Sequence, residues 1–213
     1  MKTVVGAWLN YRGAWAAMES TMRAPPHHKP PAYPVLYLKP ANTWLAPGHA
    51  IVLPSDVDEV EVGAALGVVI GRPAARVRAE DALSHVAGYR IVNDVTVPHE
   101  KVLRPPLKQK CRDGFCPLGP VVPAAQVASP DALAIRAYVN GALRQTGDTS
   151  QLIRDVARLI ADVTEFMTLG EGDVLLVGVP ENPPRARAGD RVAIEIDELG
   201  RLENPLQAEE DAR

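Results

Sequence analysis

Proline and glycine divide the apolar runs of this chain into short pieces. The 213 residues include 20 prolines and 16 glycines, which are spread through the sequence and form no repeat. Proline lacks a backbone N–H and glycine favours turns, so both residues interrupt helices and sheet ladders. Short apolar runs bounded by such residues are typical of β-strands. The sequence therefore predicts a strand-rich chain with frequent turns.

Apolar periodicity locates the expected elements. Apolar residues recur at helical spacing in two ranges. A short helix is expected within 72–89 and a longer one over 150–170. Strands are expected over 50–53, 59–71, 89–97, 172–179 and 189–196. Helices and strands do not alternate regularly, which argues against a doubly wound parallel sheet. The expected fold class is α+β, a strand-rich mixed β roll with a few peripheral helices. It would form a single domain over 1–213, with 1–45 as an amino-terminal segment packed on the core.

The longest helix is expected over 150–170. Asp148, Thr149 or Ser150 can cap its first turn, and Gly170 can end it. Its apolar stripe consists of Leu152, Val156, Leu159, Ile160, Val163, Phe166 and Met167.

Charge and composition exclude several classes of protein. The 23 basic and 26 acidic residues give a formal net charge of -3, which lacks the basic excess of a nucleic-acid-binding protein. No stretch approaches the roughly 18 to 20 apolar residues of a membrane helix, so no membrane association is expected. Cys111 and Cys116 form no disulfide framework and are expected to be reduced thiols in a cytoplasmic protein.

Familiar catalytic motifs are absent from the sequence. It contains no phosphate-binding loop, no dinucleotide-binding glycine motif, no H-E-x-x-H and no G-x-S-x-G. His27 and His28 lie in a proline-rich loop without further ligands at zinc spacing, and we expect them to be solvated. His99 and Glu100 are neighbours on an extended segment, so their side chains should point to opposite faces and lie at the surface.

Three groups of charged residues are candidates for a site. Glu59 and Glu61 would share one face of a strand, which suits either a hard divalent cation or a polar edge. Asp94 follows an apolar run, where a charge requires a cation or several donors. The segment KCRDGFCPLGP, over 110–120, is either a salt-bridged turn or an anion pocket.

Five segments follow one another along the chain: LGVVIGRPAARVRAEDALSHVAGYRIVNDV, KCRDGFCPLGP, VNGALRQTGDTSQLI, EFMTLGEGDVLLVGVP and AGDRVAIEIDELGRLEN. In this order they resemble the fumarylacetoacetate hydrolase family. Within the family, KPANT at 39–43 and KCRDGFCPLG are most similar to the amino-terminal half of members that act in homoprotocatechuate and 4-hydroxyphenylacetate breakdown. Those members decarboxylate 5-carboxymethyl-2-oxo-hex-3-ene-1,7-dioate and isomerise 2-hydroxyhepta-2,4-diene-1,7-dioate.

The resemblance implies a divalent cation, usually magnesium, that binds the oxygens of a small oxo-diacid substrate. In the family its ligands are a Glu-x-Glu before the VVIG strand and an Asp in the next strand. Asp94 occupies the Asp position, but Gly63 and Ala65 replace the two glutamates. Glu59 and Glu61 lie four residues earlier, about 13 Å along an extended strand at roughly 3.3 Å per residue. The sequence thus predicts a degenerate metal site.

Other family positions have changed as well. The NYxxH segment, whose histidine is a base in the family's hydrolases, ends here in Ala14, and the glutamate usually three residues later is Ala17. Where the family has GTP, this chain has Gly178, Val179 and Pro180, so the threonine hydroxyl is lost.

Several polar family positions are retained. The resemblance implies catalytic roles for Lys110 and Asp113 and substrate-binding roles for Arg144, Gln145 and Thr149. These residues can alternatively maintain the fold alone. Lys110 is the expected anion contact, because an ammonium group can bind a substrate carboxylate without a metal.

Three functions remain open from the sequence. We expect a subunit of the isomerase/decarboxylase, as a homodimer or as a heteromer with a carboxyl-terminal-type subunit that carries the intact metal site. The alternatives are an independently active lyase, isomerase or hydrolase on an oxo-diacid and a non-catalytic oxo-acid-binding or scaffold homologue. The independent enzyme would use Asp94 with Glu59 or Glu61.

Overall fold

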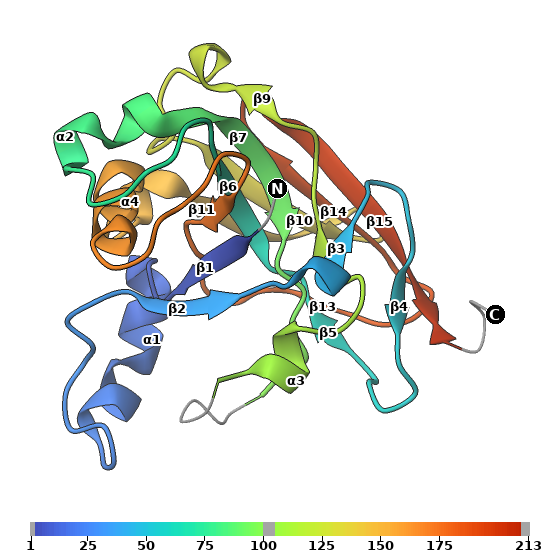
Figure 1. The fold of residues 1–213 in the computed structure, drawn as a ribbon. Coiled ribbons are helices and arrows are strands. Elements are labelled where there is room, and N and C mark those ends of the chain that lie inside the picture. The colour runs from blue at the N-terminus through green and yellow to red at the C-terminus, as the bar shows by residue number, and fades with distance from the viewer. Residues whose placement is uncertain (1–2, 100–104, 210–213) are drawn as a thin grey trace.

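Two β-sheets packed face to face form the body of the computed structural model, which describes residues 3–99 and 105–209 (Figure 1). The first sheet has six strands in the order β2-β1-β12-β6-β7-β9. Their bounds are Val35–Leu38 for β2, Val4–Trp8 for β1, Val174–Leu176 for β12, Ala64–Ile70 for β6, Val86–Asn93 for β7 and Val122–Pro123 for β9. Strand β1 runs parallel to β12, and the other neighbours in this sheet are antiparallel.

The second sheet has five strands in the order β11-β10-β14-β15-β4. Their bounds are Ala142–Asp148 for β11, Ala134–Val139 for β10, Arg191–Ile196 for β14, Gly200–Ala208 for β15 and Ile51–Leu53 for β4. Two short ribbons complete the strand content: β5 (Val60–Glu61) with β13 (Arg185–Ala186), and β3 (Trp44–Leu45) with β8 (Cys116–Pro117). The expected strand-rich α+β class is confirmed.

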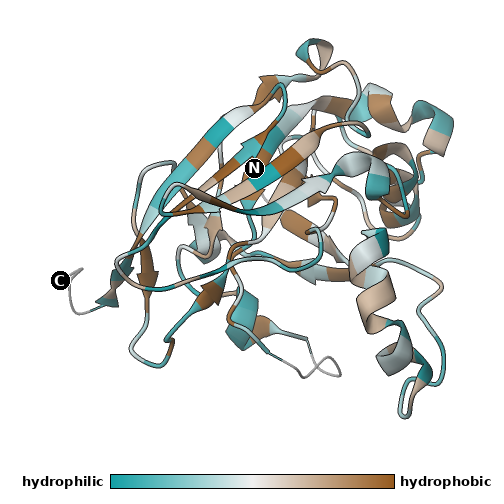
Figure 2. Ribbon diagram, turned by 180° about the vertical axis from the view of Figure 1, so that it is seen from behind, coloured by the Kyte–Doolittle hydropathy of each residue, from teal (hydrophilic) through white to brown (hydrophobic). Residues whose placement is uncertain are grey.

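The main core lies between the two sheets. Strands β10, β14 and β15 contact β6 and β7 across this layer, where Leu66, Ile91, Ile135 and Ile194 are buried together. Figure 2 shows apolar segments, in brown, along strands of the body of the molecule. Every residue of β6 is buried, because its opposite face is covered by a second apolar cluster that includes Ala65. A strand buried on both faces accounts for the continuous apolar run in the sequence.

The helices lie at the periphery. They are α1 (Arg12–Arg23), α2 (Ala79–Ala82), α3 (Leu107–Lys110) and α4 (Val156–Thr164), with single 3-10 turns η1 (Ala41–Thr43), η2 (Leu83–His85), η3 (Ala124–Gln126) and η4 (Thr149–Gln151). The expected short helix near residue 80 is confirmed as α2 followed by η2. Helix α1, whose residues are mostly half-exposed or exposed, was not predicted from its weak apolar pattern.

The prediction of one helix over 150–170 is wrong in its bounds. Asn10 binds the segment before α4: its main-chain carbonyl accepts from Ile153 N, and its Oδ1 accepts from Arg154 N. The helix therefore begins after Asp155, whose side chain caps it by accepting from Arg158 N at 2.7 Å. Phe166 does not belong to the buried stripe, because it lies beyond the helix and is 71% exposed.

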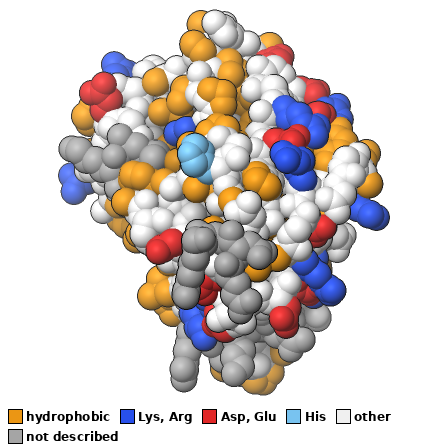
Figure 3. Space-filling view, turned by 90° about the vertical axis from the view of Figure 1, so that its right-hand side faces the viewer, with side chains coloured by type: hydrophobic (Ala, Val, Ile, Leu, Met, Phe, Trp, Pro, Cys, Tyr) orange, Lys and Arg blue, Asp and Glu red, His pale blue; other side chains and the backbone are white. Residues whose placement is uncertain are grey.

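The surface carries charges of both signs. On the face in Figure 3, acidic and basic side chains lie next to one another, and the exposed ion pairs include Arg78 with Asp81 and Arg136 with Asp197. This interspersed pattern differs from the basic stripe of a nucleic-acid-binding face. Within the described ranges, no helix is both long and apolar enough to cross a membrane.

Candidate functional site

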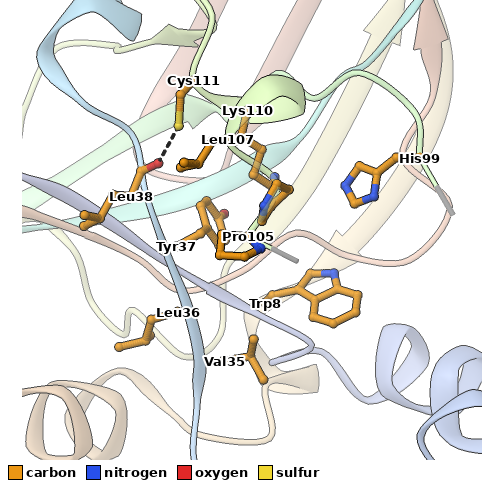
Figure 4. A pocket seen from close by; sticks show the side chains of 11 residues that line it. Trp8, Val35, Leu36, Tyr37, Leu38, His99, Pro105, Leu107, Lys110 and Cys111 are labelled. Carbon is orange, nitrogen blue, oxygen red and sulfur yellow. Dashed lines mark hydrogen bonds between the residues drawn. The ribbon is translucent and has the colours of Figure 1, made fainter. Parts of the chain in front are cut away.

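A cleft lies where β1, β2, β5 and α3 meet at one end of the first sheet. Three adjoining cavities of about 240, 390 and 420 Å³ form it, and Trp8 and Lys110 line all three. We call this space the central cleft. Figure 4 shows its widest part, where Trp8, Tyr37, His99 and Lys110 face one another.

The central cleft brings together family positions that are far apart in the sequence. The cavity of about 240 Å³ is lined by Ala14, Ala17, Gly63, Asp94, Lys110 and Val179, among others. Most of these positions carry small or apolar side chains here, so the polar groups of this part come mainly from Asp94 and Lys110, together with Glu61, Thr96 and Glu181.

Asp94 is fully enclosed and is bound by basic and phenolic groups. Its side chain is 1% exposed. Lys110 Nζ donates to Asp94 Oδ2 at 2.6 Å, and Tyr37 Oη donates to the same oxygen at 2.5 Å. Lys39 Nζ lies 3.1 Å from Asp94 Oδ1 as an ion pair. The expectation that a carboxylate in this apolar run needs a cation or several donors is met by these three side chains.

Lys39 is a buried lysine at the end of β2, with a side chain that is 0% exposed. Its ammonium group also donates to the carbonyl oxygens of Val95 at 3.0 Å and Lys110 at 2.7 Å. A buried ammonium group is tolerated when its donors are paired in this way. Lys39 therefore connects β2 to the segment after β7 and to α3, in addition to its ion pair.

Tyr37 is held beside the carboxylate by a glycine on the neighbouring strand. Gly6 pairs with Tyr37 between β1 and β2, and a Cβ on Gly6 would lie 2.3 Å from Tyr37 Cζ. The phenol ring therefore occupies space that only glycine leaves free. Lys110 Nζ lies 4.4 Å from the centroid of the same ring, which adds a cation–π contact.

Burial and ion pairing act in opposite directions on the titrating groups. Burial raises the pKa of Asp94, but the ammonium groups of Lys110 and Lys39, with hydrogen bonds from Lys110 and Tyr37, outweigh it and lower the pKa to about 2. Burial also lowers the pKa of Lys39, and Asp94 opposes that shift. The pKa of Tyr37 is raised by burial and by the adjacent Asp94 carboxylate. Asp94 is thus ionised and Tyr37 neutral at pH 7.

The pKa of Asp94 makes a testable contribution to stability. A carboxyl whose pKa is lower in the folded protein than its usual value of 3.8 stabilises the fold above that value. This contribution is lost as the pH falls towards about 2. We expect the difference in unfolding free energy between the wild type and Asp94→Asn to be flat above about pH 5 and to shrink below about pH 4. Urea unfolding across this range measures it, and a difference that grows in acid would contradict the assignment.

A divalent cation does not fit these residues. A Cβ on Gly63 would lie 2.3 Å from the Asp94 carbonyl oxygen, so a longer side chain there has no room. Ala65 is 0% exposed in the second apolar cluster. In residues 3–99 and 105–209, no group of three or more His, Cys, Asp or Glu side chains could hold a metal ion. Among the described residues, the side chains present do not fit the magnesium site that the resemblance implies, because the Asp94 carboxylate already binds two ammonium groups.

Glu61 on β5 and Glu59 just before this strand have different surroundings. Glu59 forms ion pairs with Arg185 and with Arg187 at 3.1 Å. Glu61 instead lines the central cleft with Thr96 and Lys110. The two residues therefore do not form the cation site that their spacing allowed.

The retained polar positions divide into cleft residues and distant ones. Lys110 lines the cleft, whereas Asp113 is exposed and accepts a hydrogen bond from Asn42 Nδ2 at 2.7 Å. Arg144 is exposed on β11. Thr149 is buried, and its Oγ1 accepts from Leu133 N at 2.8 Å.

Gln145 acts on the cleft indirectly. Its Nε2 donates to the carbonyl oxygens of Pro180 at 3.1 Å and Glu181 at 2.7 Å. Pro180 and Glu181 belong to the loop that lines the cavity of about 240 Å³. Gln145 therefore positions one wall of the cleft.

Sequence reasoning missed several cleft residues. Lys39 belongs to the resembling segment KPANT and Tyr37 lies two residues before it, but neither was predicted as a site residue, since nothing in one sequence shows that Lys39 is buried against Asp94. His99 was expected at the surface but is half-buried and lines the cleft. Its neighbour Glu100 lies outside the described residues.

Comparisons with known sequences identify the family of this chain. The chain belongs to the fumarylacetoacetate hydrolase family, because the family described as "Fumarylacetoacetate (FAA) hydrolase C-terminal" matches residues 3–207. The 4-hydroxyphenylacetate degradation bifunctional isomerase/decarboxylase of Salmonella dublin is 39% identical over 209 residues, which cover 98% of this chain and 48% of that protein. The chain thus spans about half the length of this curated relative.

Solved structures show the same fold. 5-carboxymethyl-2-hydroxymuconate delta-isomerase from Mycobacterium smegmatis matches with a TM-score of 0.84 and 34% identity, over 98% of this chain and 79% of that chain. Maleylpyruvate hydrolase from Sphingobium sp. SYK-6, in complex with manganese (II) ion and pyruvate, matches with a TM-score of 0.81 and 29% identity. That match covers 97% of this chain and 70% of the hydrolase chain. The fold therefore holds a divalent metal in at least one relative.

Proposed function

We propose that this chain is the amino-terminal-type subunit of an oxo-diacid isomerase/decarboxylase of 4-hydroxyphenylacetate and homoprotocatechuate catabolism. Its reactions would be decarboxylation of 5-carboxymethyl-2-oxo-hex-3-ene-1,7-dioate and isomerisation of 2-hydroxyhepta-2,4-diene-1,7-dioate. The observation that carries the proposal is that Asp94 forms ion pairs with Lys39 and Lys110. The chain in which this happens belongs to the fumarylacetoacetate hydrolase family.

The charge at Asp94 supports a division of labour between subunits. Asp94 is already paired with two ammonium groups, so its carboxylate is not available to a further cation. Decarboxylation of a 2-oxo acid places negative charge on the substrate oxygens, which a bound metal stabilises in related sites. The metal-dependent step would therefore take place in a partner subunit that keeps the Glu-x-Glu and Asp ligands.

The length of the relatives supports the same proposal. The match to the bifunctional relative covers 48% of that protein, so a second segment of similar size accompanies it there. A separate chain that supplies the equivalent of this second segment would complete the assembly.

The central cleft suits an elongated dianion. Lys110 supplies a positive charge at its centre, and Trp8, Leu36 and Pro105 supply apolar walls for the unsaturated carbon chain. The ammonium group would bind the 2-oxo acid end of the substrate, while the walls exclude water.

The first experiment measures turnover of the oxo-ene-dioate with magnesium by the loss of ultraviolet absorbance. The purified chain is assayed alone, with a family member that keeps the three metal ligands, and after co-expression of the two. We expect metal-dependent decarboxylation only in the complex, with this chain and its partner eluting together in size-exclusion chromatography.

The outcomes separate the assignments. Full magnesium-dependent decarboxylation by this chain alone would disprove the division of labour. If neither the chain nor the complex turns over the substrate, the assignment as a subunit fails, and calorimetric binding of the oxo-diacid without product would identify a binding module.

A further inference from the structure

Glu61 is an acidic residue that lines two of the three cavities of the central cleft together with Lys110. It lines the cavities of about 240 and 390 Å³, and Lys110 and Thr96 line both as well. Among the described residues, the Glu61 carboxylate makes no hydrogen bond and no ion pair, although its side chain is half-buried. A half-buried carboxylate without a partner in a cleft is available to a ligand.

The sheet geometry places Glu61 beside the Lys110 ammonium group. Glu61 N donates to Thr96 O at 2.8 Å, and Thr96 N donates to Glu61 O at 3.3 Å, so the two residues are directly opposite on antiparallel segments. Side chains of such a pair lie on the same face of the ladder. Thr96 Oγ1 in turn accepts from Lys110 Nζ at 2.7 Å. The carboxylate and the ammonium group therefore face the same space from either side of Thr96.

The surroundings of Glu61 suit a proton acceptor. Burial raises the pKa of Glu61, and nearby Asp94 adds to this effect, whereas Lys110, Arg185 and His99 oppose it. Carboxylates with raised pKa values are better bases near neutral pH than fully solvated ones. Glu59, two residues earlier, lacks these surroundings, because its carboxylate forms ion pairs with Arg185 and Arg187 away from the cleft.

Lys110 retains hydrogen-bonding capacity for a ligand. Its Nζ donates to Asp94 Oδ2 and to Thr96 Oγ1. An ammonium group has three N–H donors, so one is left over within the described chain, on a positive centre that Asp94 and Thr96 hold in place.

We propose that Glu61 is the proton-transfer residue of a metal-free enolisation site, with the Lys110 ammonium group binding the 2-oxo oxygen of an oxo-dicarboxylate. The inference rests on the proposed function only in taking an oxo-diacid as the ligand. It assigns to this chain a chemistry of its own, in addition to its contribution to an assembly.

The reaction is a reversible proton transfer without a redox change. The Glu61 carboxylate accepts a proton from C3, next to the ketone, and the electrons of the broken C–H bond form the C2=C3 double bond. The electron pair of the C2=O bond moves to the oxygen, whose negative charge lies beside Lys110. Glu61 then returns a proton to C3 to restore the oxo acid, or to a more distant carbon of a conjugated dienol to shift the double bond.

Deuterium exchange tests the proposal directly. The full-length chain is incubated with 2-oxoadipate in deuterium oxide that contains EDTA, and proton NMR follows the loss of the C3 signal. We expect the wild type to exchange C3 at least about 100-fold faster than Glu61→Gln, the usual contribution of a positioned acid–base group. Glu59→Gln is the matched control and should exchange at the wild-type rate.

Binding and metal dependence complete the test. Calorimetry should give Glu61→Gln a dissociation constant for 2-oxoadipate within roughly twofold of the wild-type value, because Lys110 is unchanged. The proposal is overturned if Glu61→Gln exchanges as fast as the wild type, or if it loses binding together with exchange. It is also overturned if the wild type exchanges only with added magnesium, or not at all.

The two proposals can fail separately. Exchange by this chain alone, with no decarboxylation in the mixed complex, would refute the subunit assignment and retain the role of Glu61. Decarboxylation in the complex, with no exchange by this chain, would support the subunit assignment and refute the role of Glu61.

Discussion

Replacement of Asp94 by alanine is expected to destabilise the protein by about 3–5 kcal/mol. The substitution leaves the ammonium group of Lys39, which is 0% exposed, without its carboxylate. It also removes the acceptor of the Tyr37 hydroxyl and of Lys110 Nζ. Removal of one partner from a buried ion pair costs this much because the other charge remains in a medium that solvates it poorly. Urea unfolding followed by tryptophan fluorescence measures the change.

An exposed ion pair provides the control for this substitution. Arg136 Nη1 lies 2.8 Å from Asp197 Oδ1 at the surface, and both side chains are partly solvated. Asp197→Ala should cost no more than about 1 kcal/mol, the usual value of an exposed pair. If the Asp94 and Asp197 variants were equally stable, the carboxylate of Asp94 would not be the buried counter-ion described above.

Gly63→Ala is expected to destabilise the protein by about 3 kcal/mol, although it adds one methyl group. The new Cβ would lie 2.3 Å from the carbonyl oxygen of Asp94. The backbone has little freedom to move away, because Gly63 O accepts from Asp94 N at 2.8 Å and Gly63 N donates to Asn93 Oδ1 at 3.0 Å. Thermal and urea unfolding both measure the loss.

Gly170→Ala is the matched control, because the nearest atom to its Cβ would be Asp173 Oδ2 at 3.4 Å, an ordinary contact. It should change the stability by less than about 1 kcal/mol. A stable Gly63→Glu protein whose melting temperature rises on addition of magnesium would contradict both the steric argument and the loss of the metal site.

The strands were predictable because their signal is local. The continuous apolar run 64–70 and the Gly-Asp turns before Val174 and Arg191 mark strands whether or not their partners are known. The start of α4 was not predictable from the sequence. The side chain and main-chain carbonyl of Asn10 accept hydrogen bonds from the residues before Asp155 and so keep them out of the helix. A contact between residues so far apart leaves no trace in a local pattern.

The candidate site was predictable only in part. The charge on Asp94 within an apolar run indicated that partners must exist, and Lys110 was identified as one basic group of the site. Lys39 and Tyr37 could not be connected to Asp94, because strand pairing within the sheet brings them there. Glu61 lines one cavity with Gly63 and Asp94, because the chain leaves β5 after Glu61 and enters β6 only at Ala64, a break that a straight-strand estimate does not include.

The parallel pairing of β1 with β12 has a consequence for how the chain folds. Val4 pairs with Val174, and Ile51 pairs with Leu206 in the second sheet, so both sheets pair strands that are more than 150 residues apart in the sequence. Such high contact order slows folding, because the entropy of closing a long loop is lost before the pairing is gained. During synthesis, β1 remains without its β12 neighbour until Leu176 has left the ribosome. The edge of β1 that faces β12 therefore stays open while the residues between the two strands are synthesised, although β2 can already cover its other edge.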